Sequence, residues 1–195
     1  IDPSFGPMDG GTNVNVNGKF AMNNQTSRII TCHFGNEESP GLLLSPMAIQ
    51  CVSPPYYKTA AVHLRISFGN NPRSESTTLF SYRRPLLVNS IKPSNGNLKG
   101  GTRIIVQGQY FEETDQLSCR FGLNTSVDAF YISSTSMLCL SPSTSIPGPV
   151  DVHVSSNGLD FSPSSVPFTY TDMQIVSISP PFTLHSTGDE DSSVS

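Results

Sequence analysis

The side chains whose chemistry is easiest to define in this sequence are its four cysteines, Cys32, Cys51, Cys119 and Cys139. An even number of cysteines in a small chain favours disulfides and an oxidising compartment. A structural zinc site would need four ligands at short local spacing, and the sequence contains no C-x-x-C. Four reduced core thiols in a cytosolic protein are the remaining alternative.

Motifs for catalysis or cofactor binding do not occur in the sequence. It has no G-x-S-x-G, H-E-x-x-H, Walker loop or G-x-G-x-x-G. His63 and His153 fall in expected strands and are interpreted as structural, while His33 and His185 have no evident acid–base partner. The acidic run 189–191 is more typical of a solvated turn than of a cation site. We therefore expect no enzyme activity, no catalytic residue, no cofactor and no metal site.

Two N-x-[ST] sequences, at Asn24 and Asn124, are candidate N-glycosylation sites. Both lie in expected loops, where a glycan would be exposed. Such short motifs also occur by chance in a chain rich in Asn, Ser and Thr. Together with the paired cysteines they favour a secreted protein.

The composition favours a fold built from short strands. Charged residues make up 13% of the 195 residues and aromatic residues 9%, whereas Ser, Thr, Asn, Pro and Gly, which favour turns, are abundant. The net charge is −4 and no segment is strongly basic, which disfavours binding to nucleic acid. No run of about 18 apolar residues occurs, so we expect no direct membrane contact in this segment.

The elements that must position these side chains repeat along the chain. The stretch from Ile1 to Phe20 returns as the stretch from Ile91 to Phe111, and each copy contains Gly-Gly-Thr. C-x-F-G, C-x-S-P and F-x-Y then recur in the same order, at offsets of 87 to 88 residues. A duplicated module accounts for this order. Duplication places the cysteines of each copy identically, so the natural disulfides lie within a module.

Each module is predicted to form about seven short strands, with no helix beyond a turn. Val14 and Val16 should face the core, with the alternating asparagines facing outward. The Asn157-Gly158 dipeptide is typical of a type I′ hairpin turn, and the Gly-Gly-Thr sequences are expected to be turns. In the second module the expected strands are Arg103–Gln107, Leu117–Phe121, Ala129–Ser133, Met137–Leu140, Val150–Ser155 and one ending at Phe168–Tyr170.

The repeat predicts the domain organisation. We expect modules at residues 1–84 and 85–171, and the start of a third, truncated module at 172–195, where the segment from Ile175 resembles the segment from Leu87. The linkers are short, and Pro85, Pro93 and Pro180 stiffen them, which predicts a semi-rigid rod. The chain has no initiator Met, so it is interpreted as a segment of a longer protein.

These landmarks resemble the IPT/TIG family of immunoglobulin-like modules. The residues that carry the resemblance are P-x-x-G-x-x-x-G-G-T at Pro3 and Pro93, then C-x-F-G and C-x-S-P in each copy. The resemblance implies an all-β fold of tandem immunoglobulin-like β-sandwiches of the E-set type. In the extracellular branch of that family, the two matching cysteines pair, which implies disulfides from Cys32 to Cys51 and from Cys119 to Cys139. Ile105 departs from the pattern because it places an apolar side chain on the outer face.

We therefore expect a non-enzymatic structural or adhesive segment of a larger cell-surface or secreted protein. Its expected partners are another protein and N-glycans on Asn24 and Asn124. The ectodomain stalk of a plexin-like ligand-binding receptor is one alternative, and a subunit of an extracellular filament, such as a flagellar appendage, is another. A DNA-binding IPT protein is the least favoured, because the second module is net acidic.

Overall fold

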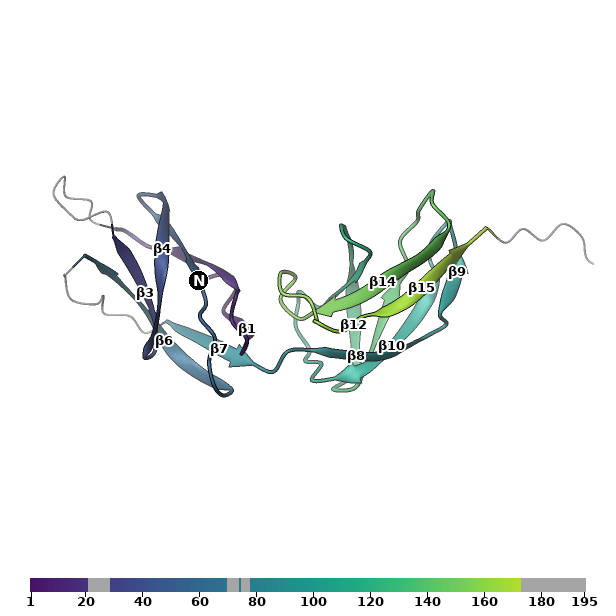
Figure 1. Cartoon of the computed structure of the whole chain (residues 1–195), viewed down its shortest axis with the longest axis horizontal. Helices are drawn as coiled ribbons and strands as arrows, with labels where there is room; N and C mark the ends of the chain where they lie inside the picture. The colour runs from purple at the N-terminus through teal and green to yellow at the C-terminus, as the bar shows by residue number, and fades with distance from the viewer. Residues whose placement is uncertain (21–28, 70–73, 75–77, 173–195) are drawn as a thin grey trace, which may run out of the picture.

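The structure is a computed structural model that describes residues 1–20, 29–69, 74 and 78–172. Every regular element among these residues is a β-strand, which confirms the predicted all-β fold. Two strand-built bodies lie side by side along the long axis and are joined by a short connection between β7 and β8 (Figure 1). No helix in the described ranges is long and apolar enough to cross a membrane.

The first module contains seven strands, which pair in the order β1-β7-β6-β3-β4-β5-β2. All neighbours are antiparallel except β1 and β7, which are parallel. The strands are β1 (Phe5–Pro7), β2 (Asn13–Asn17), β3 (Ile30–Phe34), β4 (Glu37–Ser45), β5 (Ala48–Val52), β6 (Ala60–Phe68) and β7 (Leu79–Arg83).

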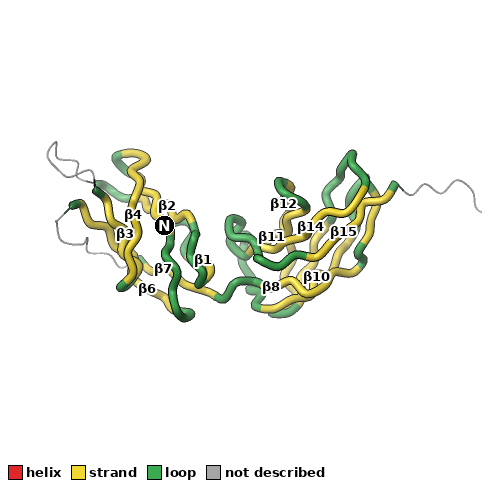
Figure 2. Tube along the Cα trace, viewed as in Figure 1, coloured by secondary structure: helices red, strands yellow, loops and turns green. Residues whose placement is uncertain are grey.

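The second module contains eight strands, in the order β8-β10-β13-β12-β11-β14-β15-β9. Seven of them match the first module one to one, from β9 with β1 to β15 with β7, and β8 is the additional strand. They are β8 (Leu87–Lys92), β9 (Asn95–Asn97), β10 (Arg103–Gln109), β11 (Ser118–Phe121), β12 (Thr125–Ser133), β13 (Ser136–Leu140), β14 (Gly148–Ser155) and β15 (Val166–Thr171). Loops cover both ends of each sandwich (Figure 2).

Each sheet folds over on itself at one long strand. In the first module, Gly41 of β4 pairs with Ile30 of β3 on one side and with Cys51 of β5 on the other. Strands two places apart in a flat sheet are about 10 Å apart, yet the Cα atoms of Cys32 and Cys51 are separated by only 6.0 Å. The strand β4 therefore passes from one layer to the other and closes the sandwich, and β12 does the same in the second module.

Alternation along the strands builds two separate cores. On β10, Ile104 and Val106 are fully buried while Arg103 and Gln107 are exposed. On β2, Val14 is fully buried and Val16 partly buried, as the sequence predicts. Buried aromatic rings from β7 and β15 complete the cores, with Phe80 edge-on to Phe34 in the first.

The Gly-Gly pairs form the predicted turns. Gly10 and Gly11 have φ of 77° and 87°, in the left-handed region where a Cβ atom is disfavoured. Their N–H groups donate to the carbonyl of Pro7, at 3.1 Å, and to that of Ser53, at 2.8 Å. The second module repeats both bonds at Gly100 and Gly101.

The segment after β14 differs from the sequence-based prediction. The prediction of a type I′ hairpin at Asn157-Gly158 is wrong. Such a turn needs positive φ at both residues; Gly158 has φ of 72°, but φ of Asn157 is not positive. The chain instead runs through residues 156–165 before β15 begins. The third module expected at 172–195 lies outside the described residues after Asp172.

Candidate functional site

All four cysteines lie in the cores and are bonded in pairs. Cys32 on β3 is joined to Cys51 on β5, and Cys119 on β11 to Cys139 on β13. Each side chain is fully buried. The bonds connect the two layers of each sandwich at equivalent places. No cysteine is free, so the structure contains neither a zinc site built from these cysteines nor reduced core thiols.

A buried tyrosine recurs at the same place in each module. The hydroxyl of Tyr82 donates to the carbonyl of Pro54 at 3.0 Å, and that of Tyr170 to the carbonyl of Pro142 at 2.9 Å. Burial raises the pKa of Tyr170 to about 12. The pKa of Tyr82 is raised further, by burial first and then by the neighbouring Tyr56 and Glu37. Both hydroxyls therefore stay neutral donors at ordinary pH.

The other residues singled out by sequence lie apart from one another. Asn124 is exposed in the turn between β11 and β12, so its side chain is accessible to modification. His63 is exposed, and Nδ1 of His153 lies 2.9 Å from the carbonyl of Ser162. Asn24, His185 and the acidic run 189–191 lie outside the described residues.

His33 proves to have polar partners that its sequence position did not reveal. Its ring is buried, with Nε2 2.8 Å from the hydroxyl of Ser67 and Nδ1 3.0 Å from a carboxylate oxygen of Glu38. Ser67 comes from β6 and Glu38 from β4, the two strands that flank β3. His33 and Ser67 are each only 6% exposed, so little of the imidazole or of the serine hydroxyl is open to solvent.

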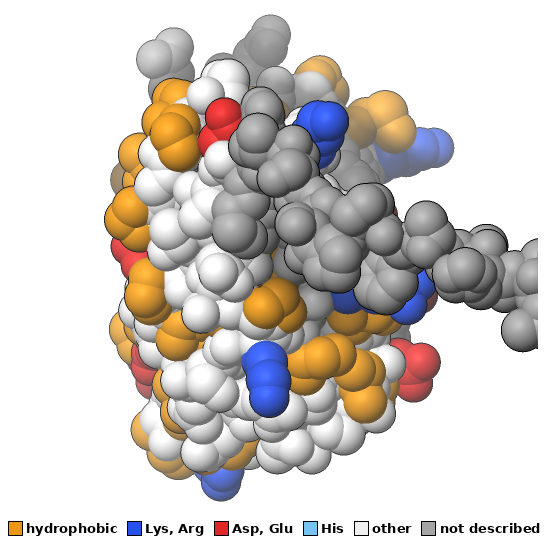
Figure 3. Space-filling model, turned by 90° about the vertical axis from the view of Figure 1, so that its right-hand side faces the viewer, with side chains coloured by type: hydrophobic (Ala, Val, Ile, Leu, Met, Phe, Trp, Pro, Cys, Tyr) orange, Lys and Arg blue, Asp and Glu red, His pale blue; other side chains and the backbone are white. Residues whose placement is uncertain are grey.

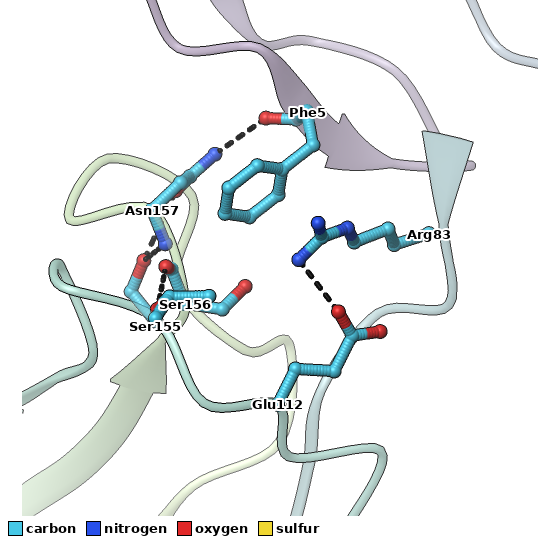
Figure 4. Close-up of polar contacts among 7 residues, drawn as sticks. Phe5, Arg83, Glu112, Ser155, Ser156 and Asn157 are labelled. Atoms are coloured by element: carbon cyan, nitrogen blue, oxygen red, sulfur yellow. Dashed lines mark hydrogen bonds and ion pairs between the residues drawn. The ribbon is translucent and has the colours of Figure 1, made fainter. Parts of the chain in front are cut away.

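A group of polar contacts joins the two modules. Arg83, at the end of β7, lies with its guanidinium carbon 3.6 Å from the centroid of the Phe5 ring on β1. Its Nη1 atom is 2.6 Å from Oε2 of Glu112 in the second module (Figure 4). The next residue, Arg84, lies over the ring of Tyr110 at 5.0 Å. Two successive arginines thus connect the first module to the second.

A second group of bonds crosses the junction from the loop after β14. Nδ2 of Asn157 donates to the carbonyl of Phe5 at 3.1 Å and to Oδ2 of Asp160 at 2.7 Å. The same Asp160 oxygen accepts the hydroxyl of Thr12 at 2.7 Å. Oδ1 of Asn157 accepts the N–H groups of Leu159 and Asp160, at 3.1 and 2.8 Å. Asn157 is only 3% exposed, so its polar atoms are paired where unpaired groups would be costly.

Beside this contact is a polar groove of about 330 Å³, lined from both modules by residues that include Asp2, Glu113 and Asp115. Within the described ranges, no group of three or more His, Cys, Asp or Glu side chains could hold a metal ion. The end of the second module shows isolated charges of both signs, separated by uncharged side chains (Figure 3).

The outer face of the second module carries an apolar row that includes Ile105, whereas the sequence alone indicated only this one apolar side chain. Ile105 pairs with Leu138, and Leu138 pairs with Phe130, which is 59% exposed. At the matching positions of the first module, Asn15 pairs with Gln50, a polar contact. The two modules share a fold but differ in the chemistry of this face.

Comparison with known proteins identifies the repeat. The sequence profile described as "IPT/TIG domain" matches residues 1–82 and again 86–170. Mouse Plexin-B3 is 24% identical over 184 residues, covering 92% of this chain and 10% of that protein. Mouse Fibrocystin-L is 30% identical over 183 residues, covering 89% of this chain and 4% of that protein. The chain therefore spans a tenth or less of the length of these relatives.

A solved structure shows the same fold. A structure of the plexin A4 full extracellular region superposes with a TM-score of 0.57 at 20% identity, covering 86% of this chain and 15% of that one. At this identity the likeness concerns the fold alone. The profile matches nearly the whole of both described modules, and the chain therefore belongs to the IPT/TIG domain family.

Proposed function

We propose that this chain is a non-enzymatic spacer in a larger extracellular or cell-surface protein, where its paired modules hold and present surfaces for protein partners. The observation that carries the proposal is the junction between the modules. A flexible tether would need no specific contacts, whereas this junction joins β1, the end of β7 and two loops of the second module.

The magnitudes favour a semi-rigid junction. Neutral hydrogen bonds and partly exposed ion pairs each contribute up to about 1 kcal/mol, and the Arg83–Phe5 stacking adds a similar amount. Only three residues separate β7 from β8, and one of them is Pro85. Because so short a linker costs little entropy to order, a few kcal/mol suffice to keep one arrangement dominant.

The extracellular location is supported by the two disulfides and by the relatives. Disulfides persist in oxidising compartments, and the plexin A4 structure is of an extracellular region. N-glycosylation at the exposed Asn124 fits the same location. The surface proposed for a protein partner is the apolar row of Ile105, Leu138 and Phe130 on the second module.

A receptor stalk is the second candidate. The similarity to Plexin-B3 extends over 92% of the chain and thus includes both modules and their junction. In a stalk the same rigid spacing would support a recognition domain elsewhere in the protein.

Residual dipolar couplings measured on a monomeric sample test the spacer. If the modules form one body, couplings from each module fit a single alignment tensor. Thr12→Val and Glu112→Gln each remove one contact across the junction and, combined, are expected to separate the tensors. Thr102→Val and Glu113→Gln are the matched controls, since no cross-module bond involves either residue. Different tensors in the unmodified chain would refute the proposal.

A further inference from the structure

The outer face of the sheet β8-β10-β13-β12 in the second module is apolar at its centre. Ile105 on β10 pairs with Leu138 on β13, which pairs with Phe130 on β12, so the apolar row crosses three strands. Phe130 is 59% exposed, and beside the row Ile132 and Leu140 are 53% and 40% exposed. The described residues therefore leave a continuous apolar surface open on this sheet.

The first module shows that the fold does not need this apolar surface. Asn15 and Gln50 occupy the two positions that are Ile and Leu in the apolar row, and Nε2 of Gln50 lies 3.5 Å from Oδ1 of Asn15. Leu42, at the position of Phe130, is 60% exposed. Because the same strands form with polar side chains at the centre of the face, strand formation does not explain the apolar centre of the second module.

Opposite charges lie on the two sides of the same face. Arg103 on β10 pairs with Leu140 on β13. Asp128 lies on the other side, one residue before Ala129 on β12. Because Ala129 pairs with Cys139, that preceding residue is in register with Leu140. Both charged residues are exposed, and neither forms an ion pair with another described residue. The first module has no charged residue at either position.

Two such faces complement each other when they pack about a two-fold axis parallel to the strands. With the axis over β13, strand β10 of one copy lies opposite β12 of the other. Arg103 then meets Asp128 of the other copy. Ile105 faces Phe130, and Leu138 meets its own counterpart on the axis. A two-fold axis across the strands would instead place both charges opposite uncharged side chains, so the charges select the first arrangement.

We propose that this face joins two copies of the chain side by side, with the two-fold axis parallel to its strands. The inference rests on the proposed function, because it takes the same apolar row as the partner surface and assigns a second copy to it. Strand β8 runs along the long axis of the molecule (Figure 1), so both copies point the same way. Such a pair suits copies that project from one surface.

The area of the face indicates a weak interface. Strands about 4.8 Å apart and rows about 6.8 Å apart give the four strands of this face roughly 400 Å² on each copy. A stable complex buries about 800 Å² per partner, so the pair belongs to the weak, transient class. We therefore expect it to form at high local concentration, with the apolar row supplying affinity and the charges fixing orientation.

Sedimentation of the disulfide-bonded chain at concentrations up to about 1 mM tests the proposal. We expect a monomer–dimer equilibrium, weakened at least about tenfold by Phe130→Asp, which places a charge in an apolar contact. Leu42→Asp is the matched control, because it makes the same change at the matching, equally exposed position of the first module, and it should leave association unchanged. A chain that stays monomeric throughout would overturn the proposal, and so would equal weakening by both variants.

Charge reversal tests the arrangement of the two copies. Arg103→Asp and Asp128→Arg each place like charges opposite one another, and the symmetry repeats the repulsion twice in a pair. Each variant is therefore expected to weaken association about tenfold. The double variant restores opposite charges and should recover the association of the unmodified chain. Failure to recover it refutes the two-fold axis parallel to the strands.

The pair and the spacer are tested separately. The dipolar couplings that test the spacer are measured on the monomeric Phe130→Asp chain. A single alignment tensor, together with an unmodified chain that does not self-associate, refutes only the pair. Separate tensors, together with a chain that forms dimers, refute only the spacer.

Discussion

Replacing Cys119 and Cys139 together by alanine is expected to lower the free energy of unfolding of the second module by about 3 kcal/mol. The two residues are 20 positions apart, and both are fully buried. In the chain-entropy description, a cross-link that closes a loop of this length restricts the unfolded chain by roughly that amount. Loss of two buried sulfur atoms acts in the same direction, because it leaves space in the core.

The size of this effect is large for a module of this length. Small domains are stable by only about 5–15 kcal/mol, so the variant should unfold at clearly lower urea concentration. Hydrogen exchange read by mass spectrometry at increasing urea assigns the loss to one module. The first module, which keeps Cys32–Cys51, should be unchanged, and the Cys32→Ala/Cys51→Ala variant should show the reverse pattern.

Two results would refute this reasoning. Four free thiols in the native protein, found by comparing peptide masses with and without reductant, would show that the pairs do not form. Equal stability of the unmodified and double-alanine chains would show that the cross-link contributes nothing to the folded module. Adding reductant to the double-alanine variant is the control, since it can affect only the remaining disulfide.

Further predictions concern single residues. Tyr170→Phe should cost about 1 kcal/mol by removing the hydrogen bond to Pro142, measurable by urea unfolding. The pKa of Tyr170 in the folded chain, about 12, lies above the ordinary tyrosine pKa of about 10 in an unfolded chain. Its contribution to stability is therefore complete below about pH 10 and is lost as pH rises toward 12, so the stability of the unmodified chain should fall in that window more than that of Tyr170→Phe. Gly100→Ala should destabilise the second module by more than 1 kcal/mol, because φ is 75° and the new Cβ would lie 2.7 Å from backbone atoms; an unchanged melting temperature would contradict the strain argument. Asn124→Gln should remove one glycan from protein secreted by eukaryotic cells, seen as the loss of a mobility shift on glycosidase treatment, and an unchanged shift would show that Asn124 is not used.

Local chemistry explains why so much of the fold could be predicted. Gly-Gly-Thr appears twice because two consecutive left-handed residues are needed where the chain turns against the C-x-S-P segment. Alternation along β10 and β14 places side chains on opposite faces whatever the surroundings. These signals act over a few residues, and duplication presents each of them twice.

The error at Asn157-Gly158 shows where local reasoning fails. The dipeptide favours a type I′ turn when nothing else competes. Here the Asn157 side chain instead holds its own loop and reaches the carbonyl of Phe5, 152 positions earlier. A tertiary contact with several hydrogen bonds outweighs a turn preference, and no periodicity in the sequence indicates it.

The sequence by itself determined that a module is repeated, that each copy is built from strands, and the positions at which cysteine, glycine and core valine recur. Only the tertiary structure decided that Arg83 meets Glu112 and that Asn157 closes the junction. The physical reason is the range of the interactions. Turn conformations and strand alternation depend on neighbours in sequence, whereas a contact between modules depends on how two completed surfaces lie against each other.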